Sequence, residues 1–105
     1  MPEVAYIVKL TAADGKRDEA MAALGRLVDA AESEPGTLQY VLYADTTDPA
    51  GIWFTELYAD EAAFDAHMSS PAMAEALGSL GGLLGGPADM RRVEIVKRKG
   101  DAVAG

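Results

Sequence analysis

The order in which strand-like and helix-like segments follow one another is the feature that most restricts the fold of this chain. Residues 3–11 (EVAYIVKLT), 37–45 (TLQYVLYAD) and 52–58 (IWFTELY) are rich in β-branched and aromatic residues, as strands are. A fourth strand is predicted at 91–99, and an amphipathic helix at 16–33 separates the first two strands. The second and third strands are close enough to form a hairpin.

A second helical region is predicted between the third and fourth strands. Asp60 is a plausible N-cap for a short helix that runs to about Met68. Pro71 restarts helical geometry at a first-turn position, and the glycine-rich stretch 78–86 ends it. That stretch lacks the features of a phosphate loop, so we expect an irregular helix end or a lid. The predicted apolar stripe of this helix is Met73, Leu77, Leu80 and Leu84.

The resulting order, β-α-β-β-α-β, predicts an α+β fold of the ferredoxin-like type, with both helical regions on one side of a four-stranded antiparallel sheet. The strands are nevertheless apolar on both faces. In the second strand Leu38, Tyr40 and Leu42 are expected on one face and Val41 and Tyr43 on the other. An uncovered apolar face favours a partner, and a second copy is the simplest one, so we expect a homodimer.

Length and composition narrow the classes of function. The 105 residues predict one domain at 1–99 with a flexible tail at 100–105. A net charge of −8 argues against nucleic acid and anionic membranes as partners. Cysteine is absent, which excludes disulfides and thiolate chemistry. No apolar run is long enough to span a membrane, and no signal peptide is evident. We therefore expect a cytoplasmic protein.

The only histidine, His67, is the first candidate for chemistry, because imidazole titrates near neutral pH when unperturbed. It follows Glu56, which lies in a strand among apolar neighbours. His67 is either a general base or acid, or a packing residue bonded to Glu56 or to the backbone. Glu56 is either a pocket acid or a structural partner of His67, Arg91 or Arg92.

Aromatic and flexible apolar side chains are the candidates for binding a substrate, although such residues more often form core. Because neighbouring strand residues alternate between faces, the sequence does not decide which of them line a cavity. The candidate substrate-binding residues are Tyr6, Tyr40, Trp53, Phe54, Tyr58, Phe64, Met68, Met73 and Leu77.

Three segments together resemble the antibiotic biosynthesis monooxygenase family: 34–40 (EPGTLQY), 53–58 (WFTELY) and 63–71 (AFDAHMSSP). The resemblance implies a dimeric α+β barrel over residues 3–98. Monooxygenases of this family oxidise quinol- or anthrone-like aromatics with dioxygen and without metal or flavin. The resemblance thus implies such an enzyme, with His67 and Glu56 as its catalytic residues. A non-catalytic dimeric binding or regulatory module of the same fold is the alternative.

Two departures from related proteins bear on cofactors. Haem-degrading relatives ligate iron through a histidine about ten positions beyond the place of His67 and use an asparagine on the first strand. This chain has Leu77 at the first position and contains no asparagine. Isomerase relatives carry a histidine late in the first helix, where this chain has Val28. We therefore expect no haem, flavin or metal, and no cofactor.

Overall fold

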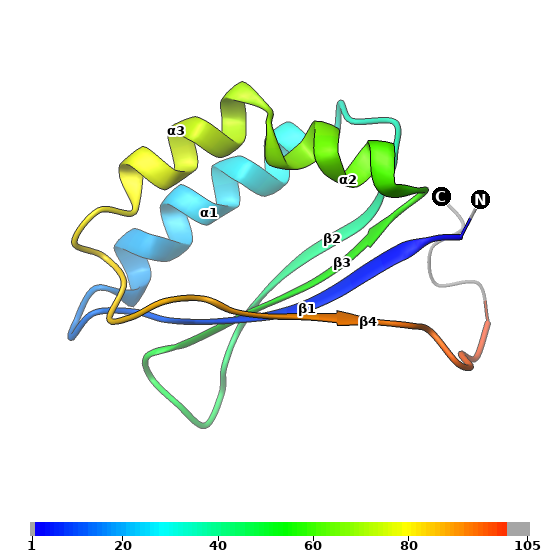
Figure 1. Ribbon diagram of the computed structural model, residues 1–105. Helices are drawn as coiled ribbons and strands as arrows, with labels where there is room; N and C mark the ends of the chain where they lie inside the picture. Colours follow the sequence, from blue (N-terminus) through cyan, green and yellow to red (C-terminus); the bar gives the residue numbers. More distant parts are fainter. Residues whose placement is uncertain (1, 101–105) are drawn as a thin grey trace.

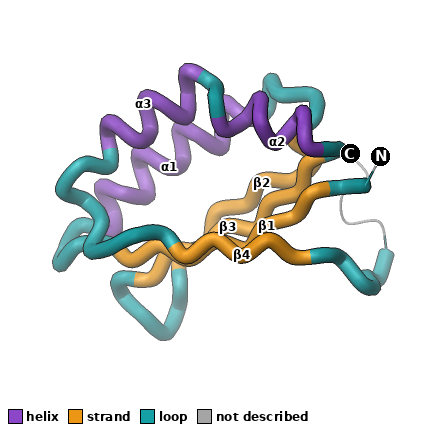
Figure 2. The backbone as a smooth tube through the Cα atoms, in the orientation of Figure 1, coloured by secondary structure: helices purple, strands orange, loops and turns teal. Residues whose placement is uncertain are grey.

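The computed structural model describes residues 2–100 and confirms the predicted βαββαβ order, with the second helical region divided into two helices (Figure 1). All strand pairs are antiparallel and the sheet order is β2-β3-β1-β4. All three helices lie on one side of the sheet (Figure 2). The elements are β1 Val4–Thr11, α1 Arg17–Ala31, β2 Thr37–Ala44, β3 Gly51–Tyr58, α2 Glu61–Met68, α3 Pro71–Ser79 and β4 Asp89–Val93.

The helices cover only half of the sheet. Helix α1 packs on β2 and β3, and its buried residues Ala20 and Ala23 are small enough to bring the helix close to the strands. Helix α3 packs against α1. Val8 and Leu10 of β1 share the core cluster with residues of α1, whereas the edge strand β4 borders a hollow.

The junction between α2 and α3 follows the predicted capping chemistry. The Asp60 carboxylate accepts a hydrogen bond from the Ala63 amide at 2.9 Å. The Ser70 hydroxyl accepts one from the Met73 amide at 3.1 Å and donates to the His67 carbonyl at 2.9 Å. These bonds satisfy backbone groups at two adjacent helix ends. They also fix the last turn of α2, which carries His67.

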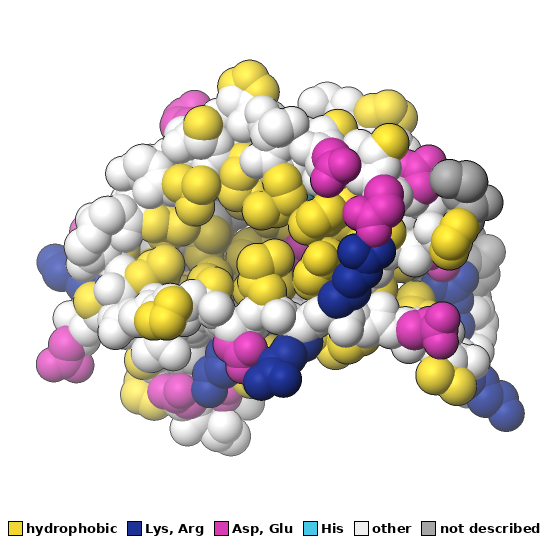
Figure 3. All heavy atoms as spheres, viewed as in Figure 1, with side chains coloured by type: hydrophobic (Ala, Val, Ile, Leu, Met, Phe, Trp, Pro, Cys, Tyr) yellow, Lys and Arg dark blue, Asp and Glu magenta, His cyan; other side chains and the backbone are white. Residues whose placement is uncertain are grey.

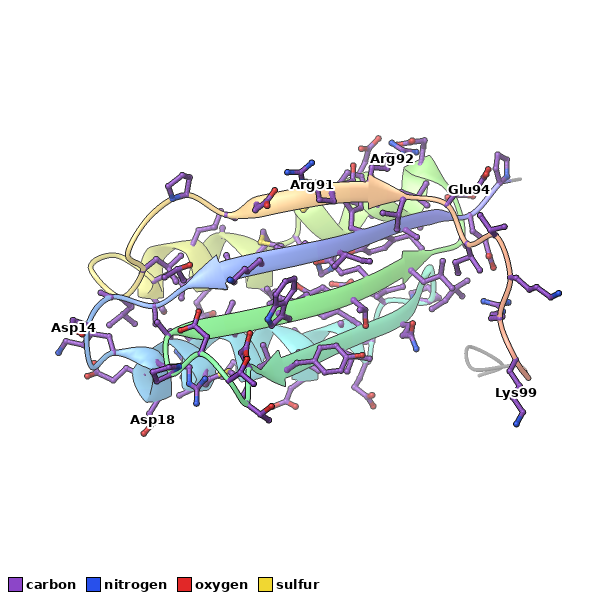
Figure 4. The ribbon with its side chains drawn as sticks, turned by 90° about the horizontal axis from the view of Figure 1, so that it is seen from below. Asp14, Asp18, Arg91, Arg92, Glu94 and Lys99 are labelled. Atoms are coloured by element: carbon purple, nitrogen blue, oxygen red, sulfur yellow. The ribbon has the colours of Figure 1, made fainter. Side chains whose placement is uncertain are left out.

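The fourth strand differs from its prediction at 91–99. Strand β4 is Asp89–Val93, and residues 94–98 belong to no strand. The last register pair is Ala5 with Val93, so β1, which begins at Val4, has only one residue left beyond that pair. Figure 4 shows the chain turning away from the sheet edge after Glu94. Apart from Gly100, the predicted tail at 100–105 lies outside the described residues.

Two predicted apolar stripes also require correction. A β-bulge between Thr37 and Gln39 makes Leu38 an extra residue, so it does not share a face with Tyr40 as predicted. In α3 the buried residues are Met73 and Ala76, and Leu77 is 63% exposed. Both errors arise because local periodicity carries no information about bulges or about which part of the sheet a helix covers.

The hairpin between β2 and β3 is tied to the start of α1 by Arg17. Its guanidinium donates to the carbonyl oxygens of Asp45, Asp48 and Gly51 at 2.9, 3.0 and 3.2 Å. The carbonyls of Asp48 and Gly51 also accept backbone hydrogen bonds within the turn, and the charged donor adds a bond to each. One side chain therefore joins two elements that are distant in sequence.

The glycine-rich segment is attached to the end of β1. The Ala13 amide donates to the Leu83 carbonyl at 2.8 Å, and the Gly85 amide donates to the Thr11 carbonyl at 2.7 Å. Leu83 and Leu84 pack against the main core cluster. These contacts favour an irregular helix end, which was the first of the two structures predicted for this segment.

Candidate functional site

A cavity of about 120 Å³ lies between the helices and the sheet, and all four strands contribute residues to its lining. Figure 3 shows this hollow and the hydrophobic side chains that surround it. The polar side chains that line it are those of His67, Glu56 and Tyr40. The apolar lining residues are Val8, Leu10, Leu24, Leu27, Phe54, Met68, Met73, Ala76, Leu77, Leu80, Ala88 and Met90.

His67 is 1% exposed and is held through one ring nitrogen. Its Nδ1 lies 2.7 Å from Glu34 Oε1, and the Thr37 hydroxyl donates to the same carboxylate oxygen at 2.8 Å. Within residues 2–100, Nε2 of His67 is buried without a hydrogen-bond partner. An Nδ1–H donated to the carboxylate leaves Nε2 as the free acceptor of a neutral imidazole.

The turn Glu34-Pro35-Gly36 brings the carboxylate to the histidine. A Cβ atom at Gly36 would lie 2.5 Å from the Cβ of Ala63, so only glycine permits this approach of the turn to α2. The Gly36 carbonyl also accepts a bond from the Ala59 amide at 2.9 Å. Glu34 therefore reaches His67 although 33 residues separate them.

Glu56 is not the hydrogen-bond partner of His67 that the sequence suggested. Its carboxyl is 7% exposed, and Tyr58 Oη donates to its Oε1 at 2.6 Å. Burial raises the pKa of Glu56, and the Tyr58 hydrogen bond and the nearby His67 oppose that rise. Burial and the Glu56 carboxyl raise the pKa of Tyr58, whose hydroxyl stays a proton donor.

The ring of Tyr40 contacts both His67 and Phe54 in the cavity lining. Its ring stacks on Phe54 with centroids 4.8 Å apart and meets the His67 ring edge-on at 4.6 Å. Burial, followed by the carboxyls of Glu56 and Glu34, raises the pKa of Tyr40, so its hydroxyl remains protonated. A rigid aromatic wall with one hydroxyl suits a flat ligand.

The structure divides the predicted substrate-binding residues into three groups. Tyr40, Phe54, Met68, Met73 and Leu77 line the cavity. Tyr6, Tyr58 and Phe64 form a second aromatic group beside it, with centroid distances of 4.8 Å for Tyr6–Phe64, 5.2 Å for Tyr58–Phe64 and 5.3 Å for Tyr58–His67.

Trp53, the remaining candidate, lies on the sheet face opposite the cavity. Its Nε1 donates to Asp45 Oδ2 at 2.8 Å, and the Lys9 ammonium lies 5.3 Å from its ring centroid. This bond and those from Thr47 hold the pKa of Asp45 well below its ordinary value. Trp53 therefore stabilises the β2–β3 hairpin.

Sequence reasoning missed Glu34 and most of the aliphatic lining. Glu34 precedes Pro35 and Gly36 and was assigned only to the end of a helix, because no local pattern links a turn to a histidine 33 residues later. The signal that was available is the pairing of a lone histidine with a carboxylate in a turn that requires glycine. Leu80 was assigned to an apolar stripe, and Leu24 and Leu27 lie in the amphipathic helix predicted at 16–33, but none of the three was predicted to line a cavity.

Neither a metal site nor a membrane span is found in the described part of the chain. Among residues 2–100, no three side chains of His, Asp or Glu are grouped so that they could hold a metal ion. No helix there has the length and apolar character needed to cross a bilayer. The expected absence of a cofactor remains a prediction.

The fold and cavity define a small α+β protein with an apolar pocket lined by a buried histidine, which a partly buried carboxylate holds. The sequence model of the antibiotic biosynthesis monooxygenase family matches residues 4–78, more than half of the chain. The chain therefore belongs to the antibiotic biosynthesis monooxygenase family, as its sequence segments predicted.

Known proteins similar to this chain agree with that assignment. A proposed antibiotic biosynthesis monooxygenase from Chloroflexus aurantiacus J-10-fl is 30% identical, with 93% of this chain and 97% of that chain covered and a TM-score of 0.80. A second one, from Caulobacter crescentus CB15, is 22% identical over 91% and 92% of the two chains, with a TM-score of 0.85, and shows the shared fold.

A curated relative, the uncharacterised protein sll1783 of Synechocystis, is 29% identical over 82 residues. The match covers 78% of this chain and 56% of that protein. The chain thus spans little more than half the length of this relative.

Proposed function

We propose that this protein is a cofactor-independent monooxygenase that oxidises quinol- or anthrone-like aromatic molecules with dioxygen. The observation that carries the proposal is the state of His67. One ring nitrogen is held by a carboxylate, the other is buried without a hydrogen-bond partner, and His67 lines an apolar cavity. A buried acceptor of this kind suits removal of a phenolic proton in a dry site.

The proposed reaction begins when His67 Nε2 takes the proton of the substrate hydroxyl. The Glu34 carboxylate stabilises the imidazolium that forms, because the two groups are 2.7 Å apart. The electron-rich anion then reduces dioxygen by one electron, the two radicals combine at a ring carbon, and the resulting peroxide anion takes the proton back from His67. Loss of water leaves one oxygen atom on the ring as a carbonyl, so a quinol and dioxygen give a hydroxyquinone and water.

Glu56 and Tyr40 orient the substrate in this proposal. Tyr58 occupies Oε1 of Glu56, which leaves the other carboxyl oxygen for a substrate group. Because burial raises the pKa of Glu56, its protonated form can donate a hydrogen bond to a carbonyl oxygen as charge develops there. The Tyr40 hydroxyl supplies a second donor from the cavity wall.

We further propose that the enzyme acts in the cytoplasm as a homodimer. Support comes from the sheet face opposite the helices, which carries the exposed apolar side chains Ile7 and Tyr43. Support for the cytoplasm comes from the absence of cysteine in the sequence.

Oxygen uptake with reduced naphthoquinol and methylhydroquinone tests the function, after subtraction of the uncatalysed oxidation. We expect His67→Ala and His67→Gln to lower the rate by about 100-fold, the usual contribution of a general base. Tyr43→Phe, on the opposite face, is the control and should leave it unchanged. No enzyme-dependent uptake with any quinol would contradict the proposal and favour a non-catalytic binding or regulatory module.

A further inference from the structure

The cavity has about the volume of a single aromatic ring. Its volume is about 120 Å³, whereas sites for drug-sized ligands measure about 300–1,000 Å³. An engineered apolar cavity of about 150 Å³ in another protein holds one benzene molecule. A fused system of three rings would therefore extend far outside this cavity.

The mouth of the cavity is apolar on three sides. Met68 from α2, Leu77 from α3 and Met90 from β4 all line it, and they are 39%, 63% and 41% exposed. Exposed apolar side chains gathered from three elements around one opening favour an apolar ligand group that continues outward. Methionine side chains adapt to ligands of varied shape, which suits a flexible chain better than a rigid ring system.

The charges of Arg92 and Glu61 do not alter the apolar character of the mouth. Arg92 on β4 donates a hydrogen bond to the carboxylate of Glu61 on α2, so the two charges offset each other. Arg92 also lies over the ring of Tyr6, with its guanidinium carbon 5.9 Å from the ring centroid. A ligand with a neutral tail is therefore better matched to the mouth than one with an ionised tail.

We propose that the substrate is a phenol or quinol with one ring and an apolar side chain. The ring occupies the cavity with its hydroxyl at His67 Nε2, and the side chain lies across Met68, Leu77 and Met90. This inference rests on the proposed function for the role of the hydroxyl and narrows its substrate class from fused polycyclic molecules to alkylated single rings.

Binding under anaerobic conditions tests the inference without requiring turnover. Calorimetry would compare phenol, 4-hexylphenol and 9-phenanthrol, the last having three fused rings, one hydroxyl and similar apolar area to 4-hexylphenol. We expect 4-hexylphenol to bind at least tenfold more tightly than phenol, since each fully buried methylene is worth about fourfold. We expect 9-phenanthrol to bind no more tightly than phenol.

Variants at the mouth distinguish the contribution of the ring to the binding affinity from that of the side chain. Leu77→Ser and Met90→Ser should each weaken 4-hexylphenol binding about threefold or more and weaken phenol binding by a smaller factor, because both residues are exposed and lie beneath the proposed side chain. Leu38→Ser, at an exposed position 38% accessible in β2 and outside the cavity lining, is the matched control and should alter neither affinity.

Tighter binding of 9-phenanthrol than of 4-hexylphenol would overturn the inference. It would also be overturned if the ratio of 4-hexylphenol affinity to phenol affinity were the same in the two mouth variants as in the parent protein. Dissociation of an oligomer by these variants in sedimentation would also overturn it, since the mouth would then be a subunit contact. Side-chain-dependent binding without oxygen uptake on hexylhydroquinone would instead contradict the monooxygenase function alone. Oxygen uptake with anthrone and not with hexylhydroquinone would contradict the substrate class alone.

Discussion

Glu34 Oε1 lies 2.7 Å from His67 Nδ1, so a residue of the turn after α1 holds the only imidazole of the chain in place. A carboxylate in this position fixes the tautomer and the ring orientation. The pair also joins two elements that no strand pairing connects.

Removal of the Glu34 charge should reduce catalysis and leave substrate binding nearly intact. In Glu34→Gln the amide oxygen can still accept the Nδ1 proton, but the imidazolium loses its counter-charge, so we expect kcat to fall about 10-fold or more with little change in KM. Oxygen-uptake kinetics measure this. Glu32→Gln, exposed in the same segment, is the control, and equal kcat values for the two variants would contradict the role of Glu34.

The pH dependence of stability should report on Glu56. Since its pKa is raised on folding, the folded state binds this proton more tightly than the unfolded state does. The stability from protonated Glu56 is complete below the ordinary value of 4.5 and is lost as pH rises through the folded-state pKa. Glu56→Gln, which stays neutral, should therefore gain stability relative to the parent between pH 4 and pH 8. Urea titrations at several pH values measure this difference, and a difference that shrinks with rising pH would contradict it.

Gly36→Ala should destabilise the protein and disturb the site together. The added methyl group would lie 2.5 Å from the Ala63 Cβ, so α2 or the turn must move. We expect a loss of about 1–3 kcal/mol, as for other overpacked contacts. Thermal unfolding measures it, and Ala63→Gly in the same chain should restore part of the loss. Gly25→Ala, where nothing lies within 4 Å of the new Cβ, should instead stabilise α1.

Arg17→Met should loosen the β2–β3 hairpin. The substitution leaves the carbonyls of Asp45, Asp48 and Gly51 without their shared donor, and hydrogen bonds to a charged group contribute about 1.5–3 kcal/mol. We expect faster hydrogen exchange in the turn and a lower free energy of unfolding by urea. Arg26→Met, exposed on the same helix, is the control. Equal effects of both changes would show that the carbonyl contacts are not the cause.

The sequence predicted the fold well because periodicity and capping act locally. Asp60 and Pro71 marked helix starts correctly, and the strands β1, β2 and β3 were placed within one or two residues. The site was predicted less completely. His67 was found as the only histidine, but its partner Glu34 comes from a distant turn, and the face of Trp53 depends on the register of the sheet. Contacts of this kind are set by tertiary packing.

The division of the sheet into a covered and an uncovered half separates two sets of constraints. Residues packed between α1 and the sheet, such as Ala20 and Ile52, must keep their volume because other core residues surround them. Residues around the open half, such as Leu77, Ala88 and Met90, are exposed and can change at little cost in stability. Substrate preference in this fold can therefore diverge rapidly through surface substitutions, and closely similar backbones can serve different molecules.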